Sequence, residues 1–227
     1  MNPVYSSQLL KIVNTLIYSV PAMLIAIVLH EVAHAAVSYA CGDKGVKADG
    51  RLSLNPFKHL DVAGTLCLIF FHMGWAKPVM VNTRNYKHKK LDFCLVALAG
   101  PVMNFLIAFI SLIFMFIVLL HGGDSGISNY FRMLFYYIAV LNVGLGVFNL
   151  IPIPPLDGSN VLLTLLPDSV NTKIAPYRRY FPLLLVILLI TGLLDMPLSV
   201  LNNNILNGMW GVVLKIFGYT IGSGATI

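Results

Sequence analysis

Charged side chains are scarce in this sequence, in which Asp, Glu, Lys and Arg make up only 11% of 227 residues. Soluble globular domains carry about 25% charged residues, so the composition excludes an ordinary water-soluble domain. Hydrophobic residues reach 58%, and this excess indicates a protein that lies in a lipid bilayer. Glutamate is the rarest charged residue, because Glu31 is the only one in the chain.

Cysteine is also rare, and the sequence has no pattern for export or repetition. Cys41, Cys67 and Cys94 are odd in number and lack metal-type spacing, which argues against a disulfide framework. The N-terminus, MNPVYSSQLLK, lacks a basic region followed by a small-residue cleavage site, so we expect no removable signal peptide. Without repeats or low-complexity tracts, we expect a single membrane-embedded domain over residues 1–227, with its core at about 15–165 and C-terminal spans at about 180–217.

Long apolar runs are the main feature that is present. A helix needs about 20 apolar residues to cross about 30 Å of hydrocarbon. The runs that reach or approach this length lie at about 9–39, 93–120, 131–151 and 181–194. Residues 196–217 would add a span despite the interruption LNNNILNG, and 65–75 is short enough for a re-entrant or interfacial piece. We therefore expect an all-α polytopic membrane protein with about 4–6 membrane segments.

Lysine and arginine are unevenly distributed among the loops. The segments 41–64, 77–90 and 157–180 hold 12 of the 15 basic residues, and the loop 121–129 holds none. Because basic loops stay in the cytoplasm, we expect these three segments on the cytoplasmic side of the cell membrane. The end of the first span and the segment after the third span then meet at one leaflet.

The run MLIAIVLHEVAHAAVSY, at 23–39, places ionisable side chains inside an apolar span. Such groups are costly in a bilayer and are usually functional there, although two core histidines bonded among helices are the plain alternative. His30 and His34 are four residues apart, so they share one helix face, and H-E-x-x-H spacing suits two ligands of a tetrahedral zinc. Glu31 is placed to take a proton from water that the metal activates. The motif therefore predicts metal-dependent hydrolysis.

A catalytic zinc needs a third protein ligand, which the first span does not offer at short spacing. Asp157 is favoured, because prolines at 152, 154 and 155 break the helix before it. Non-helical backbone at membrane depth is tolerated only against protein or a water-filled cavity, where an aspartate can bind a cation. The alternative is that Asp157 only caps the next helix. The remaining candidates are His59, Asp61, His72 and His121.

Five motifs occur in the order found in site-2 proteases, the intramembrane zinc metalloproteases. They are HEVAH, LNPFKHLDVAGT, GWAKPVMVN, ALAGPVMNF and FNLIPIPPLDG, and the chain resembles that family over about residues 15–165. The resemblance implies one zinc ion, with these residues in the family's roles: ligands His30, His34 and Asp157, and the catalytic base Glu31. Asn149 matches a family position that orients substrate or stabilises an oxyanion, the alternative being a bond to nearby backbone. The loops leave no room for an insert, so the chain resembles a minimal form without PDZ or CBS domains.

Two segments beside the first span alternate apolar and polar side chains, as β-strands do. They are RLSLN (51–55) and KPVMVN (77–82). Site-2 proteases are similar in placing a small sheet beside the active site. We therefore predict a small interfacial β-sheet near the active site that pairs with an unwound substrate, the alternative being a pair of membrane-surface loops.

The run ALAGPVMNF, at 97–105, contains small residues that let helices approach closely in lipid. We expect Ala97, Ala99 and Gly100 to pack against the helix that bears the histidines. Asn104 is a candidate for lining the substrate cavity.

The expected partners are the lipid bilayer and a membrane protein or signal-peptide-like substrate, with no nucleic acid, and a homo-oligomer remains open. Cobalt or manganese would also suit the N₂O ligands. A metal transporter or channel is an alternative that leaves Glu31 without a role. A di-iron oxidase needs more histidines than the six present, and a proteolytically inactive binding homologue would have no need to keep Glu31.

Overall fold

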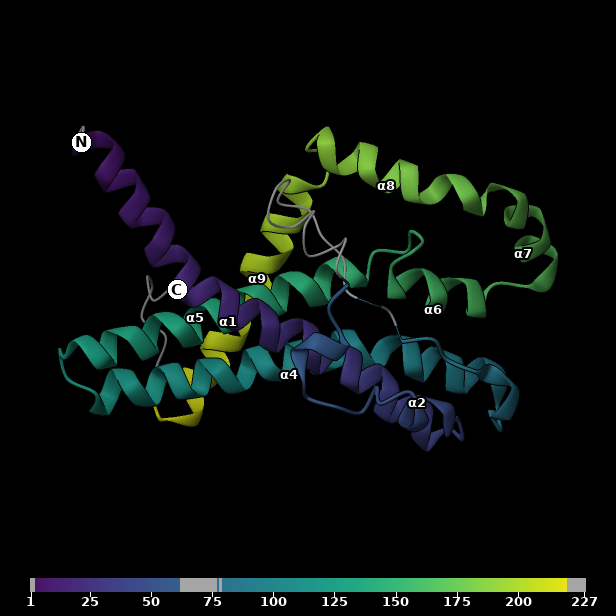
Figure 1. Cartoon of the computed structure of the whole chain (residues 1–227), viewed down its shortest axis with the longest axis horizontal. Helices are drawn as coiled ribbons and strands as arrows, with labels where there is room; N and C mark the ends of the chain where they lie inside the picture. Colours follow the sequence, from purple (N-terminus) through teal and green to yellow (C-terminus); the bar gives the residue numbers. More distant parts are fainter. Residues whose placement is uncertain (1–2, 62–76, 78, 220–227) are drawn as a thin grey trace. The chain divides into compact units, whose positions relative to one another are not determined.

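The computed structural model describes residues 3–61, 77 and 79–219, with side chains from residue 14 onward, and this part of the chain is helical (Figure 1). The α-helices are α1 (Pro3–Ala40), α2 (Gly45–Ala48), α4 (Lys89–His121), α5 (Gly126–Asn149), α6 (Asp157–Leu165), α7 (Asp168–Ile174), α8 (Phe181–Ile190) and α9 (Asp195–Ile216). The 3-10 helices are η1 (Pro56–Lys58), η2 (Thr83–Asn85) and η3 (Ala175–Tyr180). The predicted all-α class is confirmed.

Three helices are long and apolar enough to cross a bilayer, namely α4, α5 and the part of α1 at Asn14–Ala40. The pair Asp168–Ile190 and Asp195–Ile216 also passes the test together, but it bends by 82° at the break. Gly192 lies at that break with φ +68°, a left-handed conformation that favours glycine and ends a helix. The described residues thus give three spans, or four if the bent pair is one. The upper count of four equals the lowest of the predicted 4–6 membrane segments. The predicted re-entrant or interfacial piece at 65–75 lies outside the described residues.

The asparagine-rich stretch LNNNILNG does not interrupt the last helix. Residues 201–208 are helical and lie within α9. Asparagine has only a modest cost in a helix interior, so the apolar residues around this stretch are enough to continue the helix.

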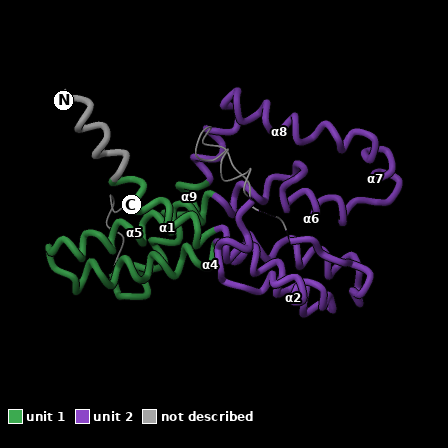
Figure 2. The backbone as a smooth tube through the Cα atoms, in the orientation of Figure 1, with its two compact units in different colours: residues 1–26, 105–144, 202–227 green, residues 27–104, 145–201 purple. Residues whose placement is uncertain are grey.

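The chain divides into two compact units, each assembled from separate stretches (Figure 2). Unit 1 contains residues 1–26, 105–144 and 202–227, and unit 2 contains residues 27–104 and 145–201. Aromatic contacts join the helices of unit 1, since Tyr18 stacks on Tyr137 with ring centroids 5.7 Å apart and Phe116 meets Trp210 at 5.6 Å. Unit 2 holds every residue of the candidate site, and the single-domain expectation stays a prediction.

Within unit 2, α1 and α4 approach each other through small residues. Ala33, Ala35 and Ala97 are buried, and a Cβ added at Gly100 would lie 2.4 Å from His34 Nε2. Real Cβ contacts are essentially never shorter than 3.0 Å, so glycine is what allows α4 to lie against the histidine rings. The stretch at 97–105 therefore packs against the helix that bears the histidines, as the sequence indicates.

The predicted β-sheet is wrong for the described residues. Residues 51–55 form a turn followed by irregular backbone, and 79–82 form no strand. The Val79 amide donates to Glu31 Oε2 at 3.2 Å, and the Asn82 amide donates to Asp43 Oδ2 at 2.7 Å. Carboxylate side chains therefore take the hydrogen bonds that a partner strand would take, so alternation at 79–82 did not mean a sheet.

Candidate metal centre

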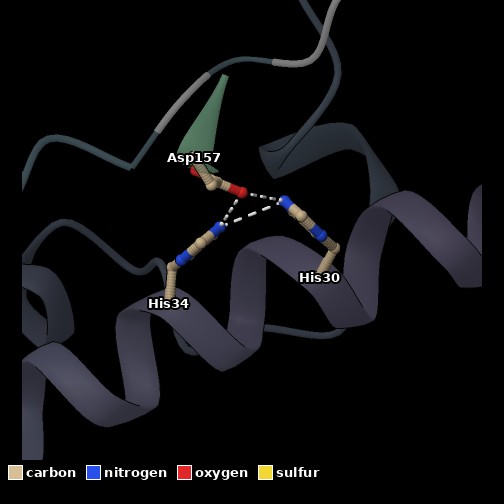
Figure 3. Close-up of side chains that lie close together, drawn as sticks. All are labelled: His30, His34 and Asp157. Carbon is tan, nitrogen blue, oxygen red and sulfur yellow. Dashed lines mark hydrogen bonds and ion pairs between the residues drawn. The ribbon is translucent and has the colours of Figure 1, made fainter. Parts of the chain in front are cut away.

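Three side chains from two distant parts of the chain meet in unit 2. His30 and His34 lie one turn apart on α1, and Asp157 is the first residue of α6. All three point toward one another (Figure 3). The two Nε2 atoms are 3.0 Å apart, and each lies 3.1 Å from Asp157 Oδ2. The structure therefore brings together the three residues that the sequence singled out.

The other ring nitrogens define which atoms face the centre. His34 Nδ1 lies 2.6 Å from the Val96 carbonyl oxygen, and His30 Nδ1 lies 2.5 Å from Asn104 Oδ1. Since a carbonyl oxygen can only accept, each Nδ1 carries the proton and donates it. A neutral imidazole has one N–H, so both Nε2 lone pairs face the Asp157 carboxylate.

This cluster fits a divalent metal. Three acceptor atoms at 3.0–3.1 Å from one another repel unless a cation lies among them. Two ligands at about 2.0 Å from a tetrahedral zinc are about 3.3 Å apart, close to the observed separations. The Nδ1 bonds to Val96 and Asn104 are the outer hydrogen bonds that fix the tautomer and ring angle of metal-binding histidines.

The proline-rich break before α6 delivers the carboxylate. Leu156 is the N-cap residue of α6, and no side chain caps the helix, so the alternative in which Asp157 is the cap is wrong. Burial alone would raise the pKa of Asp157. Without a metal, protonated His30 and His34 rings would donate to Asp157 through Nε2, and these bonds and charges outweigh burial and lower the pKa of Asp157 to about 2. A cation bound among the three side chains favours the carboxylate in the same way. The group is therefore a carboxylate at neutral pH, which is the form that binds metal.

Gly158 allows this delivery. A Cβ at this position would lie 2.2 Å from the carbonyl oxygen of Leu150, which immediately follows α5. A side chain at 158 would push the start of α6 away from the end of α5. The glycine after Asp157 is therefore a steric requirement of the site.

Glu31 directly follows His30 in the sequence, but its side chain does not belong to the cluster of His30, His34 and Asp157. It is half-buried, and its Oε2 accepts the Val79 amide hydrogen at 3.2 Å. A carboxylate that is held by a backbone donor, next to a metal ligand, is suited to proton transfer.

The two predicted asparagines make contacts inside the protein. Asn104 is fully buried, and its described bond is with His30. Asn149 donates an amide hydrogen to the Leu145 carbonyl of its own helix at 3.0 Å, which matches the plain alternative. A role toward substrate stays a prediction for both residues.

The other candidate ligands lie apart from the three convergent side chains. His59 is buried, and its Nε2 lies 2.6 Å from the Ser53 carbonyl oxygen, while His121 is exposed at the end of α4. Asp61 is not part of the cluster, and His72 lies outside the described residues. Sequence reasoning missed Val96, because only its backbone takes part and every residue has a carbonyl.

Comparisons with known proteins agree with this geometry. The model of peptidase family M50 matches residues 117–191, which include Asp157. YwhC of Bacillus subtilis (strain 168), whose name places it provisionally among zinc metalloproteases, is 38% identical over 180 residues, covering 78% of this chain and 81% of YwhC. Rip2 of Mycolicibacterium smegmatis, with the same provisional designation, is 29% identical over 198 residues, covering 82% of this chain and 71% of Rip2.

A third relative extends well beyond the region that it shares with this chain. The zinc metalloprotease MJ0392 of Methanocaldococcus jannaschii is 29% identical over 178 residues, which are 77% of this chain and 42% of MJ0392. No solved structure matches the chain significantly.

The apolar helices, the cluster of two histidines and an aspartate, and these relatives define the chain as a metallopeptidase. Within that class, the chain belongs to peptidase family M50, the site-2 protease family.

Proposed function

We propose that the chain is an intramembrane zinc endopeptidase that cleaves peptide bonds in or near the transmembrane segments of membrane proteins. His30, His34 and Asp157 hold one zinc ion, and Glu31 is the general base. The substrate is a membrane protein or a signal-peptide-like segment. The enzyme lies in the cell membrane with its active site toward the cytoplasm, on the side of the basic loops.

One observation supports this proposal above all: three acceptor atoms converge at 3.0–3.1 Å with both imidazole protons directed away. This donor set is the kind that catalytic zinc uses, with three protein ligands and an open fourth position. A transport site would require the same ligands but would give no role to Glu31.

In this mechanism each residue of the chain has a distinct task. Bound zinc supplies Lewis acidity, which acidifies water and polarises a peptide carbonyl. Glu31 takes the proton as water attacks the scissile carbonyl and passes it to the leaving amine. Asn149 has a second amide hydrogen beyond the one given to Leu145, and we assign it to the developing oxyanion.

The substrate must lose helical structure before it reacts. A transmembrane helix hides its carbonyls in its own hydrogen bonds, and in lipid each lost bond costs several kcal/mol. Cleavage therefore favours segments with residues that weaken a helix, such as glycine or proline.

The test compares cells that express the parent chain with cells that express Glu31→Gln. Membrane proteomics should reveal new termini in or near transmembrane segments only with the parent, because the amide of glutamine cannot accept the proton. A substrate identified in this way is then reconstituted in vesicles with each purified protein. We expect Glu31→Gln to bind about as much zinc as the parent and to lose at least about a hundredfold in kcat.

Asp157→Asn is the matched variant, because it should lose zinc and cleavage together. Retained cleavage by Glu31→Gln would contradict the proposal. Metal flux through parent vesicles without cleavage of any membrane protein would favour the transporter instead.

A further inference from the structure

The segment 79–82 is tied to the region of α1 by two carboxylates. The Val79 amide donates to Glu31 Oε2 at 3.2 Å, and the Asn82 amide donates to Asp43 Oδ2 at 2.7 Å. Glu31 lies within α1, whereas Asp43 follows the end of that helix. The segment is therefore fixed at both ends, with one end on the proposed catalytic base.

Asp43 is a buried, hydrogen-bonded carboxylate that holds the segment 79–82, and we call it the anchor of that segment. Its side chain is only 2% exposed, and a buried carboxylate is costly unless donors surround it. Three donors do so: the Asn82 amide and the Ser38 hydroxyl at 3.2 Å reach Oδ2, and the Gly45 amide reaches Oδ1 at 3.0 Å. The Gly45 bond is local, because it joins residues two apart in the chain, whereas the other oxygen accepts the Asn82 amide and so serves the segment 79–82.

Ser38 and Tyr86 complete the anchor. Ser38 is fully buried and gives its single proton to Asp43, so the Tyr86 hydroxyl, 2.7 Å away, must donate to Ser38. Burial raises the pKa of Tyr86, and the Ser38 bond offsets this only in part. The phenol therefore keeps the proton that it donates. Tyr86 follows η2, which begins directly after Asn82, so this bond holds the chain just beyond the segment.

A segment 79–82 that is held by the anchor restrains the Glu31 carboxylate. With Oε2 bonded to the Val79 amide, the carboxylate plane is restrained, and among the described residues Oε1 makes no hydrogen bond or ion pair. A base with one oxygen fixed and one free is oriented for proton transfer, and small misplacements of such a group are expensive in rate.

We propose that 79–82 is a positioning device for the general base: Asp43, with Ser38 and Tyr86, holds the segment so that the Val79 N–H orients Glu31. This inference rests on the proposed function of Glu31. Val79 and Asp43 act through Glu31 and are positioning residues.

The sharpest test removes the backbone N–H group of Val79 and leaves its side chain unchanged. Replacing the Val79 amide by an ester, through incorporation of the corresponding α-hydroxy acid, deletes the N–H and keeps the side chain. We expect kcat to fall about tenfold to a hundredfold, as for loss of a hydrogen bond to a charged group. KM, zinc content and thermal unfolding should stay close to the parent values. The control is the same ester at Met80, whose amide has no hydrogen bond among the described residues and whose side chain is 77% exposed.

A second pair of variants tests the anchor. Asp43→Asn keeps one acceptor oxygen and should lower kcat less than Asp43→Ala does. Because Asp43 and Val79 act through one contact, Asp43→Ala combined with the Val79 ester should lower kcat little more than the ester alone. A merely structural role would instead lower zinc content and thermal stability, and the effects on kcat would add.

The outcomes separate this inference from the proposed function. If Glu31→Gln is inactive but the Val79 ester and both Asp43 variants keep kcat within about twofold of the parent, the positioning role is overturned and the general base stands. If Glu31→Gln cleaves like the parent, both proposals are overturned. Additive losses of kcat in the combined variant would also overturn the positioning role.

Discussion

The orientation of two imidazole rings decides what the site can bind. His34 is held by the Val96 carbonyl and His30 by the Asn104 side chain. Both partners accept the Nδ1 proton, so both Nε2 atoms are free for a cation. Outer partners of this kind raise the basicity of the ligand and fix its angle, and their loss weakens metal binding by about 10- to 100-fold.

Asn104→Ala should therefore weaken zinc binding by about 10- to 100-fold, because the His30 ring loses the acceptor that fixes its tautomer. Competition with a chromophoric chelator measures the affinity. Asn104→Asp keeps an acceptor oxygen and should bind zinc more tightly than Asn104→Ala does.

Asn142→Ala is the control for this prediction. Asn142 is also fully buried, but its side-chain amide donates to the Ile138 carbonyl of its own helix in unit 1. Equal zinc affinity in Asn104→Ala and the parent would show that Asn104 does not orient His30.

At the scale of elements, the site depends on how closely two helices approach. A Cβ at Gly100 would lie 2.4 Å from His34 Nε2 and 2.5 Å from His30 Cε1. These atoms belong to two rings that are already restrained at Nδ1, so they cannot simply turn away.

Gly100→Ala should displace the imidazoles and reduce zinc affinity. Overpacking of this kind costs roughly 1–3 kcal/mol, or about 5- to 150-fold in binding. Zinc content and cleavage of the reconstituted substrate should fall together. Gly208→Ala is the control, since nothing lies within 4 Å of its added Cβ and it also lies in a helix. Normal zinc content in Gly100→Ala would contradict the close approach of α4.

Much of this element-level arrangement was predictable from the sequence. The i and i+4 spacing placed His30 and His34 on one face, and the prolines before Asp157 indicated a break that could deliver a ligand. The partners of these ligands were not predictable, because Val96 and Val79 contribute backbone groups that every residue has. The sheet prediction failed at 79–82 because alternation reports which side chains share a face. It does not report whether a backbone donor meets a strand or a carboxylate such as Asp43.

At the scale of the whole molecule, the loops differ in charge. Three segments hold 12 of the 15 basic residues, and the loop between α4 and α5 contains none. The positive-inside rule then predicts that the basic segments lie in the cytoplasm. Each of the three segments joins membrane helices or follows one, so their common side can be tested directly.

Single cysteines report that side. In a variant with the three native cysteines replaced by serine, Lys58→Cys should react with an impermeant maleimide only after the cells are opened. Asp124→Cys, whose native side chain is fully exposed, should react in intact cells. Labelling of Lys58→Cys in intact cells would contradict the predicted orientation. It would show that the active site faces the outside of the cell.

The most direct test of the central claim is zinc K-edge X-ray absorption on the purified protein. Coordination by His30, His34 and Asp157 predicts two imidazole nitrogens and oxygen neighbours at about 2.0–2.2 Å, with no sulfur. In Asp157→Asn the bound zinc should be lost or its spectrum changed. A sulfur neighbour at about 2.3 Å, or an unchanged spectrum in Asp157→Asn, would contradict the metal centre described above.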